Sequence, residues 1–251
     1  MIRVAVAGAL GRMGRVAVSA LHDLPDVLYV GGFARAAVPA DQIVDDFDAL
    51  LERKPDVVLD LTTHPATVGL SMRALAGGAR PVIGATGWTS SERAALAERA
   101  QKLGLGAMLV PNFSLGAALM MQFAQEAARF FPSVEIVEMH HAGKKDAPSG
   151  TARLTAERIA AGGGRSDVPI HSVRLPGLAA HQEVLFGGAG ELLTIRHDSL
   201  GREAYVPGML AAIRAVMNVQ GLIVGLDAVL RPSSFVLRQA QDEKVGGGLD
   251  D

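Results

Sequence analysis

The sequence predicts an α/β chain in which a doubly wound parallel sheet is followed by a second, α+β domain with a mixed sheet. Through the first 112 residues, short aliphatic runs alternate with helical patterns, which is typical of a parallel sheet covered by helices on both faces. A glycine-rich turn directly follows the first of these runs. From residue 134 onward, strand-like runs predominate and one helical pattern interrupts them, so the architecture changes between the two halves.

The first element predicted is a strand, because Arg3-Val4-Ala5-Val6-Ala7 is the short apolar run expected of a strand buried on both faces. It leads into Gly8-Ala9-Leu10-Gly11-Arg12-Met13-Gly14 and then a helical pattern, which is the context of a Rossmann-like dinucleotide-binding turn. The spacing G-x-x-G-x-x-G is a variant of the commoner G-x-G-x-x-G and keeps the tight turn, the close approach to a pyrophosphate and the helix–strand packing. We expect cofactor contacts from Gly8, Ala9, Leu10, Gly11, Arg12 and Met13. A glycine-rich turn without a ligand is the alternative.

The second predicted strand, Val27–Phe33, ends in Ala34-Arg35, and this end bears on the choice of nucleotide. A site specific for NAD places an Asp or Glu there for the ribose hydroxyls. This chain has an arginine there and no acid, so Arg35, assisted by Arg12, would meet a 2′-phosphate. The sequence therefore favours NADPH over NADH, the alternative being that Arg35 is simply solvated.

The remaining elements of the first sheet follow in the same alternation. We expect a loop over residues 39–43, a short helix over 45–51, a strand over 57–61, a helix from Pro65 to about residue 76, a strand over 81–84, a helix to about residue 103 that opens with the capping box Thr89-Ser90-Ser91-Glu92, and a strand over 105–110. Ligands on such sheets lie beyond the carboxyl ends of the strands. These ends should line one crevice: the glycine turn, Ala34-Arg35, Thr62-Thr63, Gly84-Ala85-Thr86 and Pro111-Asn112-Phe113.

The second half is predicted to contain a long apolar helix, from Gly116 to about Phe131 before Pro132, and a mixed or largely antiparallel sheet with strands over 134–140, 170–175, 184–186 and 192–197. An open apolar face of this sheet would need a cover, which a partner subunit would supply. A helix over 205–219 and the apolar runs 222–224 and 226–230 would pack back on the first sheet. The predicted dinucleotide-binding domain is therefore discontinuous: residues 1–112 plus 205–251, with a disordered tail over 239–251, flank a substrate-binding and oligomerisation domain over 113–204.

A charged cluster runs from His140 to Thr151, between a predicted strand and a predicted helix over 151–161. Two adjacent histidines, two lysines and an aspartate precede Ser149-Gly150-Thr151, whose free backbone N–H groups at a helix start favour an anionic ligand. Histidine as a residue type titrates near neutrality, so His140 is a candidate general acid, whereas a lysine is a charged donor, so Lys144 suits a carboxylate. The helix start would hold a second carboxylate. The alternative is a solvated basic loop capped by Ser149.

Composition narrows the functional classes. The chain has 251 residues and a formal net charge of −2, which provides no field for nucleic acid or an acidic membrane. No apolar run reaches the roughly 18 residues of a membrane span, and the N-terminus reads as a strand rather than a signal peptide. Without cysteine the chain has no disulfide or thiolate ligand, and its scattered histidines indicate no metal site. These features suit a cytoplasmic protein whose partner is a small molecule.

Four stretches carry a resemblance to a known family, in order along the chain: Gly8–Gly14, Gly84–Gly87, Pro111–Gly116 and Glu138–Ala152. The chain resembles the 4-hydroxy-tetrahydrodipicolinate reductases, also called dihydrodipicolinate reductases, of bacterial and plant lysine and diaminopimelate biosynthesis. The resemblance implies reduction of the cyclic dicarboxylate 4-hydroxy-tetrahydrodipicolinate to tetrahydrodipicolinate by NADH or NADPH. It also implies a homotetramer assembled through the second domain.

The resemblance maps the family's functional residues onto this sequence. It implies a proton donor or acceptor at His140, a second donor at Lys144, and substrate contacts at His141, Ser149, Gly150 and Thr151. It implies contacts to the nicotinamide side of the cofactor from Gly84, Ala85, Thr86, Val110, Pro111, Asn112 and Phe113. The family often has an acid before the arginine at the end of the second strand, and Ala34-Arg35 departs from that pattern in favour of NADPH.

Two other functions stay open on the sequence alone. A different Rossmann-type NAD(P)-dependent dehydrogenase, acting on another small carboxylate, would use the same crevice. A non-catalytic nucleotide-sensing module would also bind the nucleotide. Such sensors usually carry a DNA-reading domain or a basic surface, and the sequence indicates neither.

Overall fold

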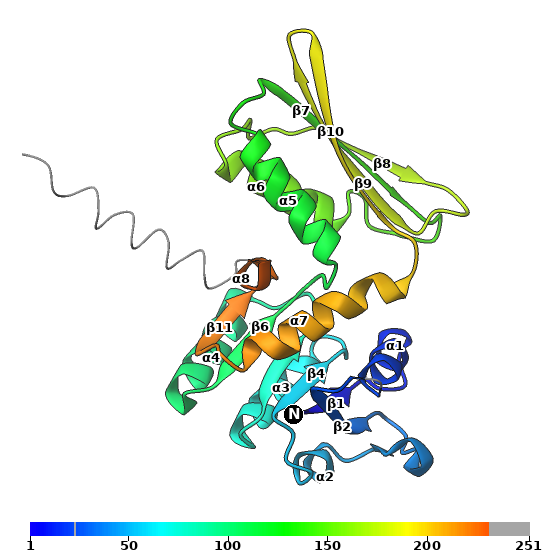
Figure 1. Cartoon of the computed structure of the whole chain (residues 1–251), viewed down its shortest axis with the longest axis vertical. Helices are drawn as coiled ribbons and strands as arrows, with labels where there is room; N and C mark the ends of the chain where they lie inside the picture. The colour runs from blue at the N-terminus through cyan, green and yellow to red at the C-terminus, as the bar shows by residue number, and fades with distance from the viewer. Residues whose placement is uncertain (23, 231–251) are drawn as a thin grey trace, which may run out of the picture.

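The computed structural model describes residues 1–22 and 24–230 and shows two sheets, each with its own helices (Figure 1). The first sheet has seven strands, all parallel, in the order β11-β6-β5-β4-β1-β2-β3. The second has four strands in the order β10-β9-β7-β8 and is mixed. The predicted fold class, a Rossmann-like doubly wound sheet with a second mixed sheet, is confirmed.

Strands and helices alternate through the first sheet, as the apolar runs predict. Its strands are β1 (Ile2–Ala7), β2 (Val27–Phe33), β3 (Ile43–Val44), β4 (Val57–Asp60), β5 (Arg80–Ile83), β6 (Gly106–Leu109) and β11 (Gly221–Val224). Its helices are α1 (Arg12–Leu21), α2 (Phe47–Leu51), α3 (Ala66–Ala76), α4 (Ser90–Leu103), α7 (Val206–Val216) and α8 (Asp227–Leu230), with 3₁₀ turns η1 (Pro39–Asp41) and η2 (Arg202–Tyr205). The predicted capping box of α4 is present in full.

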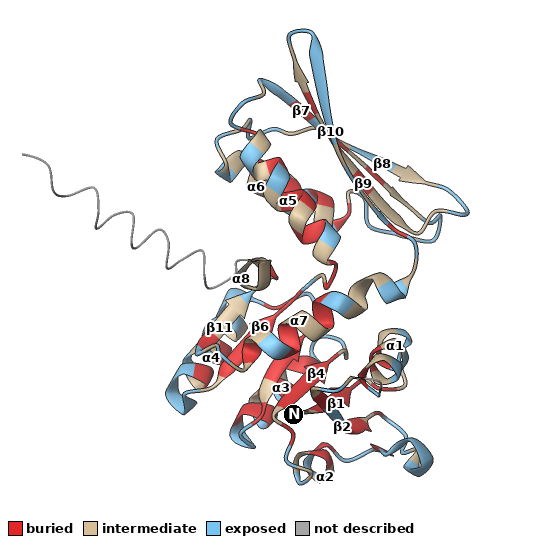
Figure 2. Cartoon of the chain, in the orientation of Figure 1, coloured by how far each residue is buried: buried red, intermediate tan, exposed pale blue. Residues whose placement is uncertain are grey.

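Both faces of the first sheet are buried because its strands carry apolar side chains in both directions. In β1, Val4 and Val6 pack in the cluster that contains α1 and α7. Ala5 and Ala7 pack in the cluster that contains α2 and α3. All four side chains are fully buried, as the red strands at the centre of this sheet show in Figure 2. The carboxyl ends of the strands remain as the edge at which such sheets bind ligands.

The second sheet is covered on one face by two helices. Its elements are α5 (Leu115–Ala127), β7 (Ser133–His140), α6 (Gly150–Ala161), β8 (Ile170–Arg174), β9 (Ala180–Gly188) and β10 (Glu191–Ser199). Along β7, Val134 and Ile136 are buried against residues of α5 and α6. Glu138 continues this alternation and is equally buried, whereas Ser133 and Glu135 are exposed. A carboxyl group therefore occupies a core position of this strand.

The chain returns to the first sheet after the second one. β11 pairs in parallel with β6, with Gly221 opposite Gly106. This return supports a discontinuous first domain. We propose that residues 1–112 plus 205–251 form one domain and residues 113–204 the other. The predicted disordered tail over 239–251 lies outside the described residues. No helix within residues 1–22 and 24–230 is long and apolar enough to cross a membrane.

Two strand predictions differ from the structure because pairing extends strands beyond their local pattern. The loop expected over residues 39–43 contains the turn η1 and the start of β3, a two-residue edge strand that exists through its pairing with β2. β9 has nine residues rather than the predicted 184–186. Its polar first half, which includes His181 and Glu183, is held between β7 and β10.

Several helix boundaries also differ: α2 begins at Phe47 rather than at residue 45, and α7 ends at Val216 rather than at residue 219. α5 ends at Ala127 instead of about Phe131, and the N–H groups of Arg129 and Phe130 donate to carbonyls three residues back, which tightens the last turn. α3 begins one residue after Pro65, which is its N-cap rather than its first helical residue. The one-residue difference at α3 is within the normal variation of helix ends, whereas α5 is shorter because its end tightens into the three-residue turns.

Gly14 is predicted to be indispensable for the packing of α1 on the glycine turn. A Cβ there would lie 2.1 Å from the Gly8 carbonyl oxygen and 2.8 Å from the Ala9 backbone. We expect Gly14→Ala to lower the free energy of unfolding by about 1–3 kcal/mol, measured by urea denaturation. Gly69→Ala in α3, where the added Cβ meets nothing within 4 Å, should instead stabilise by about 0.5–1 kcal/mol. Equal stability of the two variants would contradict the packing argument.

Candidate active site

His140 is the last residue of β7, and its side chain is 15% exposed. The chain turns directly afterwards, and the Lys144 N–H donates to the His141 carbonyl at 3.1 Å. Because the strand ends at His140, strand alternation does not govern His141, which is an exposed loop residue. The two adjacent histidines therefore have different surroundings.

Lys144 lies in the loop between β7 and α6 and is paired within that loop. Its Nζ donates to both carboxylate oxygens of Asp146, at 2.8 and 2.9 Å. The hydrogen bond from Lys144 lowers the pKa of the Asp146 carboxyl below its ordinary value. Half of the Asp146 side chain is exposed, so this pair stabilises the loop only slightly and a stronger anion can replace it.

The start of α6 is formed by three residues that the sequence marks as a carboxylate site. The Ser149 hydroxyl caps the helix by accepting from the Ala152 N–H at 3.1 Å. The Ser149 N–H donates to a Glu138 carboxylate oxygen at 3.2 Å, so both polar groups of this serine already have partners. The N–H groups of Gly150 and Thr151 belong to the first helical turn, where amides precede the i→i−4 bonding. They are the donors that the helix start offers to an anion.

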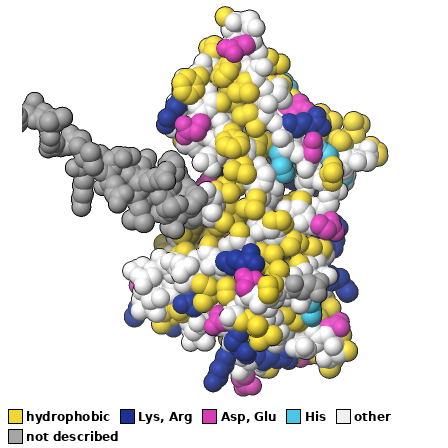
Figure 3. Space-filling view, in the orientation of Figure 1, with side chains coloured by type: hydrophobic (Ala, Val, Ile, Leu, Met, Phe, Trp, Pro, Cys, Tyr) yellow, Lys and Arg dark blue, Asp and Glu magenta, His cyan; other side chains and the backbone are white. Residues whose placement is uncertain are grey.

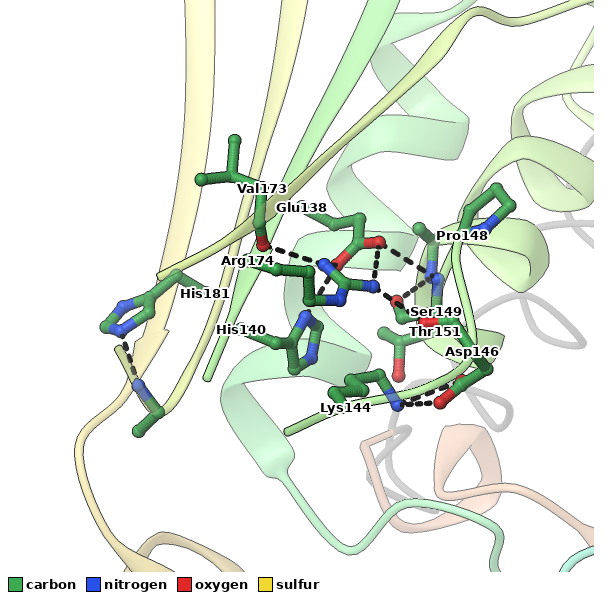
Figure 4. A network of polar contacts seen from close by, with 12 residues as sticks. Glu138, His140, Lys144, Asp146, Pro148, Ser149, Thr151, Val173, Arg174 and His181 are labelled. Carbon is green, nitrogen blue, oxygen red and sulfur yellow. Dashed lines mark hydrogen bonds and ion pairs between the residues drawn. The ribbon is translucent and has the colours of Figure 1, made fainter. Parts of the chain in front are cut away.

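Glu138 joins these parts of the site, as Figure 4 shows. Its side chain is fully buried, and Arg174 of β8 binds it through two hydrogen bonds of 2.6 and 2.9 Å. The ring nitrogen Nδ1 of His140 lies 2.5 Å from the carboxylate oxygen Oε2. The Ser149 N–H binds the other oxygen. One carboxylate therefore contacts the imidazole, the helix start and a guanidinium.

Ionisation in this network follows from burial and pairing. Burial raises the pKa of Glu138, but hydrogen bonds from Arg174, Ser172 and His140, together with the Arg174 charge, outweigh it and lower the pKa to about 2. Burial lowers the pKa of His140, and the Lys144 and Arg174 charges act in the same direction, while Glu138 opposes them. At neutral pH the carboxylate is ionised, and the pKa of the imidazole is below its ordinary value.

The lowered pKa of Glu138 predicts a loss of stability in acid. The native pKa of about 2 lies below the ordinary value of 4.5, so the carboxylate contributes stability that is present above about pH 4.5 and is lost as the pH falls towards 2. Urea unfolding measured across this range should show the free energy of unfolding falling, with part of the slope absent in Glu138→Gln. An identical slope in that variant would contradict the assignment.

The predicted cofactor turn is tied to the end of β2. The N–H groups of Gly8 and Ala9 both donate to the Phe33 carbonyl, at 2.9 and 3.1 Å. Gly8 has φ +79°, and a Cβ there would lie 2.9 Å from the Leu61 backbone, so this position requires glycine. Gly11 caps α1 without a side-chain hydrogen bond, so no side chain occupies the amides at the start of this helix. This geometry fits a pyrophosphate held by backbone N–H groups.

The other predicted cofactor residues differ in exposure. Arg12 and Arg35 are exposed, as a contact to a phosphate on the surface of the crevice requires. A Cβ on Gly84 would lie 2.9 Å from the Phe113 ring, so the ends of β5 and β6 lie against each other. Val110 is fully buried and Phe113 is 5% exposed. Their side chains belong to the core, and their backbone is what could contact a ligand.

Two contacts join the sheets near the cluster. The Asn112 side chain, just after β6, donates from Nδ2 to the Thr151 hydroxyl at 3.3 Å. Arg158 of α6 binds Asp227 of α8 through two hydrogen bonds of 2.7 and 2.6 Å. A predicted nicotinamide residue therefore touches a predicted substrate residue. In Figure 3 histidine side chains lie on the upper lobe, close to the waist between the two sheets.

Sequence reasoning missed Glu138 and Arg174 as members of this site. A signal for Glu138 was present, because it continues the buried alternation of Val134 and Ile136 and a charge at a core position calls for a function. Arg174 had no such signal. It ends an ordinary predicted strand, 36 residues after Glu138, and only the pairing of β7 with β8 brings the two together.

The fold defines a class of protein, namely chains that combine a parallel sheet of the dinucleotide-binding type with a second, mixed sheet. A family model described as dihydrodipicolinate reductase, N-terminus, matches residues 2–113, and one described as dihydrodipicolinate reductase, C-terminus, matches residues 116–230. The chain belongs to the dihydrodipicolinate reductase family. The resemblance seen in the sequence is confirmed.

Individual relatives agree with this assignment. The chain is 42% identical to the 4-hydroxy-tetrahydrodipicolinate reductase of Synechococcus elongatus, with 91% of this chain and 98% of the relative covered. It is 43% identical to that of Halalkalibacterium halodurans, with 92% and 100% covered. The solved dipicolinate-bound dihydrodipicolinate reductase from Paenisporosarcina sp. TG-14 is 38% identical, with a TM-score of 0.83 over 90% of this chain and 98% of that one. A C. glutamicum DAP dehydrogenase in complex with DAP, 16% identical over 96% and 99% of the two chains with a TM-score of 0.61, shares the fold.

Proposed function

We propose that this chain reduces 4-hydroxy-tetrahydrodipicolinate to tetrahydrodipicolinate with a nicotinamide cofactor, in lysine and diaminopimelate biosynthesis. The proposal is carried by one observation: the Asn112–Thr151 contact joins the carboxyl end of the parallel sheet to the start of α6, which follows His140 at the end of β7 and Lys144 in the loop between them. Relatives with this name at 42–43% identity, covered almost completely, support the same reaction.

The cluster is suited to a ring with two carboxylates. Lys144 would exchange Asp146 for one substrate carboxylate, an exchange between exposed partners that costs little. The Gly150 and Thr151 amides at the start of α6 would hold the other. His141, exposed in the same loop, would contact the substrate as well, and Ser149 would act by shaping the helix start.

His140 is the proposed general acid. The overall conversion adds a hydride and a proton and releases the ring hydroxyl as water. A bound nicotinamide would supply the hydride, so the chain itself must deliver the proton. Burial lowers the pKa of His140, and the two negative charges of a bound substrate would raise it again, because a nearby anion favours the imidazolium. Lys144 would aid protonation as a second charged donor. Substrate binding would thus favour the protonated form of His140, which donates the proton in the reaction.

The proposed cofactor contacts lie at the carboxyl ends of β1, β2, β5 and β6. The backbone of the glycine turn would hold the pyrophosphate, and the backbone of residues 84–86 and 110–113 would line the nicotinamide end. NADPH is the preferred nucleotide, because Arg35 stands exposed at the end of β2 where a ribose-binding acid would select NADH. Arg12, also exposed, would assist.

Arg35 offers a direct test of this preference. We expect Arg35→Ala to lower kcat/KM for NADPH by about 10- to 100-fold, the value of a charged hydrogen-bonded contact, with little change for NADH. Steady-state kinetics with each nucleotide measure the ratio. Arg165→Ala, which removes an exposed arginine bound to Asp167 in the other domain, is the matched control. Equal loss for both nucleotides would mean that Arg35 does not read the 2′-phosphate.

A homotetramer built through the second sheet is also proposed. The face of this sheet opposite α5 and α6 carries Val137, Met139, Leu185 and Leu192, and Leu192 is 68% exposed. The same face also carries the ion pairs Glu135–His171 and Glu183–Arg196, so copies of the chain would cover a surface of both apolar and charged side chains. Light scattering of the purified protein measures the number of chains in the assembly directly.

We also propose a cytoplasmic location for the protein.

The function itself is tested by NADPH oxidation with freshly generated substrate. We expect turnover that depends on the dicarboxylate and declines when one carboxylate is absent from the substrate. A protein that binds NADPH but does not oxidise it with this substrate would overturn the proposal. Faster turnover with another small carboxylate would reassign the substrate and keep the reductase class.

A further inference from the structure

Glu138 is a charge placed where the strand calls for an apolar side chain. It follows Val134 and Ile136 on the face of β7 that packs against the helices, and all three are at most 3% exposed. Burying an ion pair is rarely the most stable choice, because a well-packed apolar replacement is often equal or better. Core packing therefore does not explain the pair with Arg174, and its contacts point to another role.

Those contacts reach each part of the proposed site. One oxygen, Oε1, accepts from Arg174 and from the Ser149 N–H at the start of α6. The other oxygen, Oε2, accepts from Arg174 and lies 2.5 Å from His140 Nδ1. Arg174 also donates to the Asp146 carbonyl at 2.7 Å and so holds the loop that carries Lys144. The imidazole, the helix start and the lysine loop are all connected through this one buried pair (Figure 4).

An ionised carboxylate only accepts hydrogen bonds, so the His140 nitrogen that faces it must carry a proton. We propose that Glu138, held by Arg174, is a positioning residue that keeps Nδ1 of His140 protonated and leaves Nε2 as the nitrogen that exchanges a proton with the substrate. This inference rests on the proposed function, since it assigns the pair a task in the same reaction. Arg174 keeps the carboxylate ionised and in place.

Glu138 and Arg174 also affect the pKa of His140, and hence the pH range in which His140 can donate a proton. Three charged groups face the imidazole: Glu138 on its own strand, Arg174 from β8 and Lys144 from the loop. The two cations and burial oppose the imidazolium, and only Glu138 favours it. Removing that charge leaves the opposing effects alone, so the general acid would lose its proton at lower pH.

The matched pair of variants is Glu138→Gln and Glu135→Gln. Glu135 lies on the same strand and binds His171 Nε2 at 2.7 Å, but both side chains are more than half exposed. We expect Glu138→Gln to lower kcat by about 100- to 10,000-fold, as when an amide replaces a carboxylate that orients a catalytic imidazole. Its KM for NADPH should be little changed, and the basic limb of its kcat–pH profile should move to lower pH. Glu135→Gln should match wild type in all three.

Two measurements separate positioning from a structural role and from poor folding. In a His140→Ala background, Glu138→Gln should cost no further activity, because a residue that acts through His140 loses its effect with it. Nitrogen-15 NMR of the wild-type imidazole reports the tautomer without any variant, and Nδ1–H should be the neutral form. Nε2–H as the neutral form, additive losses in the double variant, or full activity of Glu138→Gln with an unmoved pH limb would each overturn the inference. An inactive wild type would instead count against the proposed function, and the tautomer would still decide the inference.

Discussion

Replacing His140 with alanine should lower kcat by about 100- to 10,000-fold, the usual contribution of a general acid. The imidazole lies at the end of β7, where Nδ1 contacts the buried Glu138 carboxylate and the side chain is 15% exposed. Affinity for NADPH should stay close to that of wild type, because the proposed nucleotide contacts lie on the first sheet. Steady-state kinetics give the loss in turnover, and nucleotide fluorescence gives the dissociation constant.

His171→Ala is the control for this variant. His171 lies on the adjacent strand β8 and also pairs with a glutamate, but its side chain is 55% exposed and outside the cluster. Its loss should leave turnover close to wild type. If His140→Ala weakened NADPH binding as much as it lowered kcat, the role of His140 would be misplaced.

Replacing Lys144 with alanine should lower kcat/KM for the dicarboxylate by about 30- to 1,000-fold, since the charged partner of a substrate carboxylate is lost. Part of this loss should appear in KM, because Lys144 binds a carboxylate, and part in kcat, because it aids protonation. Both parameters come from substrate titrations at saturating NADPH. The loss should shrink with a substrate analogue that has one carboxylate.

The neighbouring Lys145 provides a close control, because it has the same charge and lies in the same loop but is exposed. Lys145→Ala should keep most of the activity. Equal losses in the two lysine variants would mean that the loop contributes only a general positive charge. In that case the specific carboxylate contact proposed for Lys144 would be wrong.

Local patterns were sufficient wherever an element is stabilised by its own residues. The apolar run of β1, the glycine turn after it and the capping box of α4 all appear where the sequence places them. β3 and the first half of β9 could not be predicted, because they are strands only through pairing with β2, β7 and β10. The same reason explains why boundaries differ more often than the elements themselves.

The candidate site divides in the same way. Its chemistry-bearing stretch, from His140 to Thr151, is continuous in the sequence and was recognised there. Glu138, only two residues earlier, is in phase with the apolar Val134 and Ile136, but the sequence alone does not show that α6 and Arg174 enclose its carboxylate. In the structure the Glu138 side chain is buried and binds the Ser149 N–H at the start of α6, which makes it part of the candidate site.

The sequence by itself determined most of the alternation of strands and helices, the glycine turn and the charged stretch from His140 to Thr151, because each depends on neighbours along the chain. Only the tertiary structure decided which side chains meet. Arg174 reaches Glu138 across 36 residues and Asn112 reaches Thr151 across 39, through the pairing of strands and the packing of α6. Hydrogen bonds of that kind depend on the relative placement of whole elements, and no local pattern contains them.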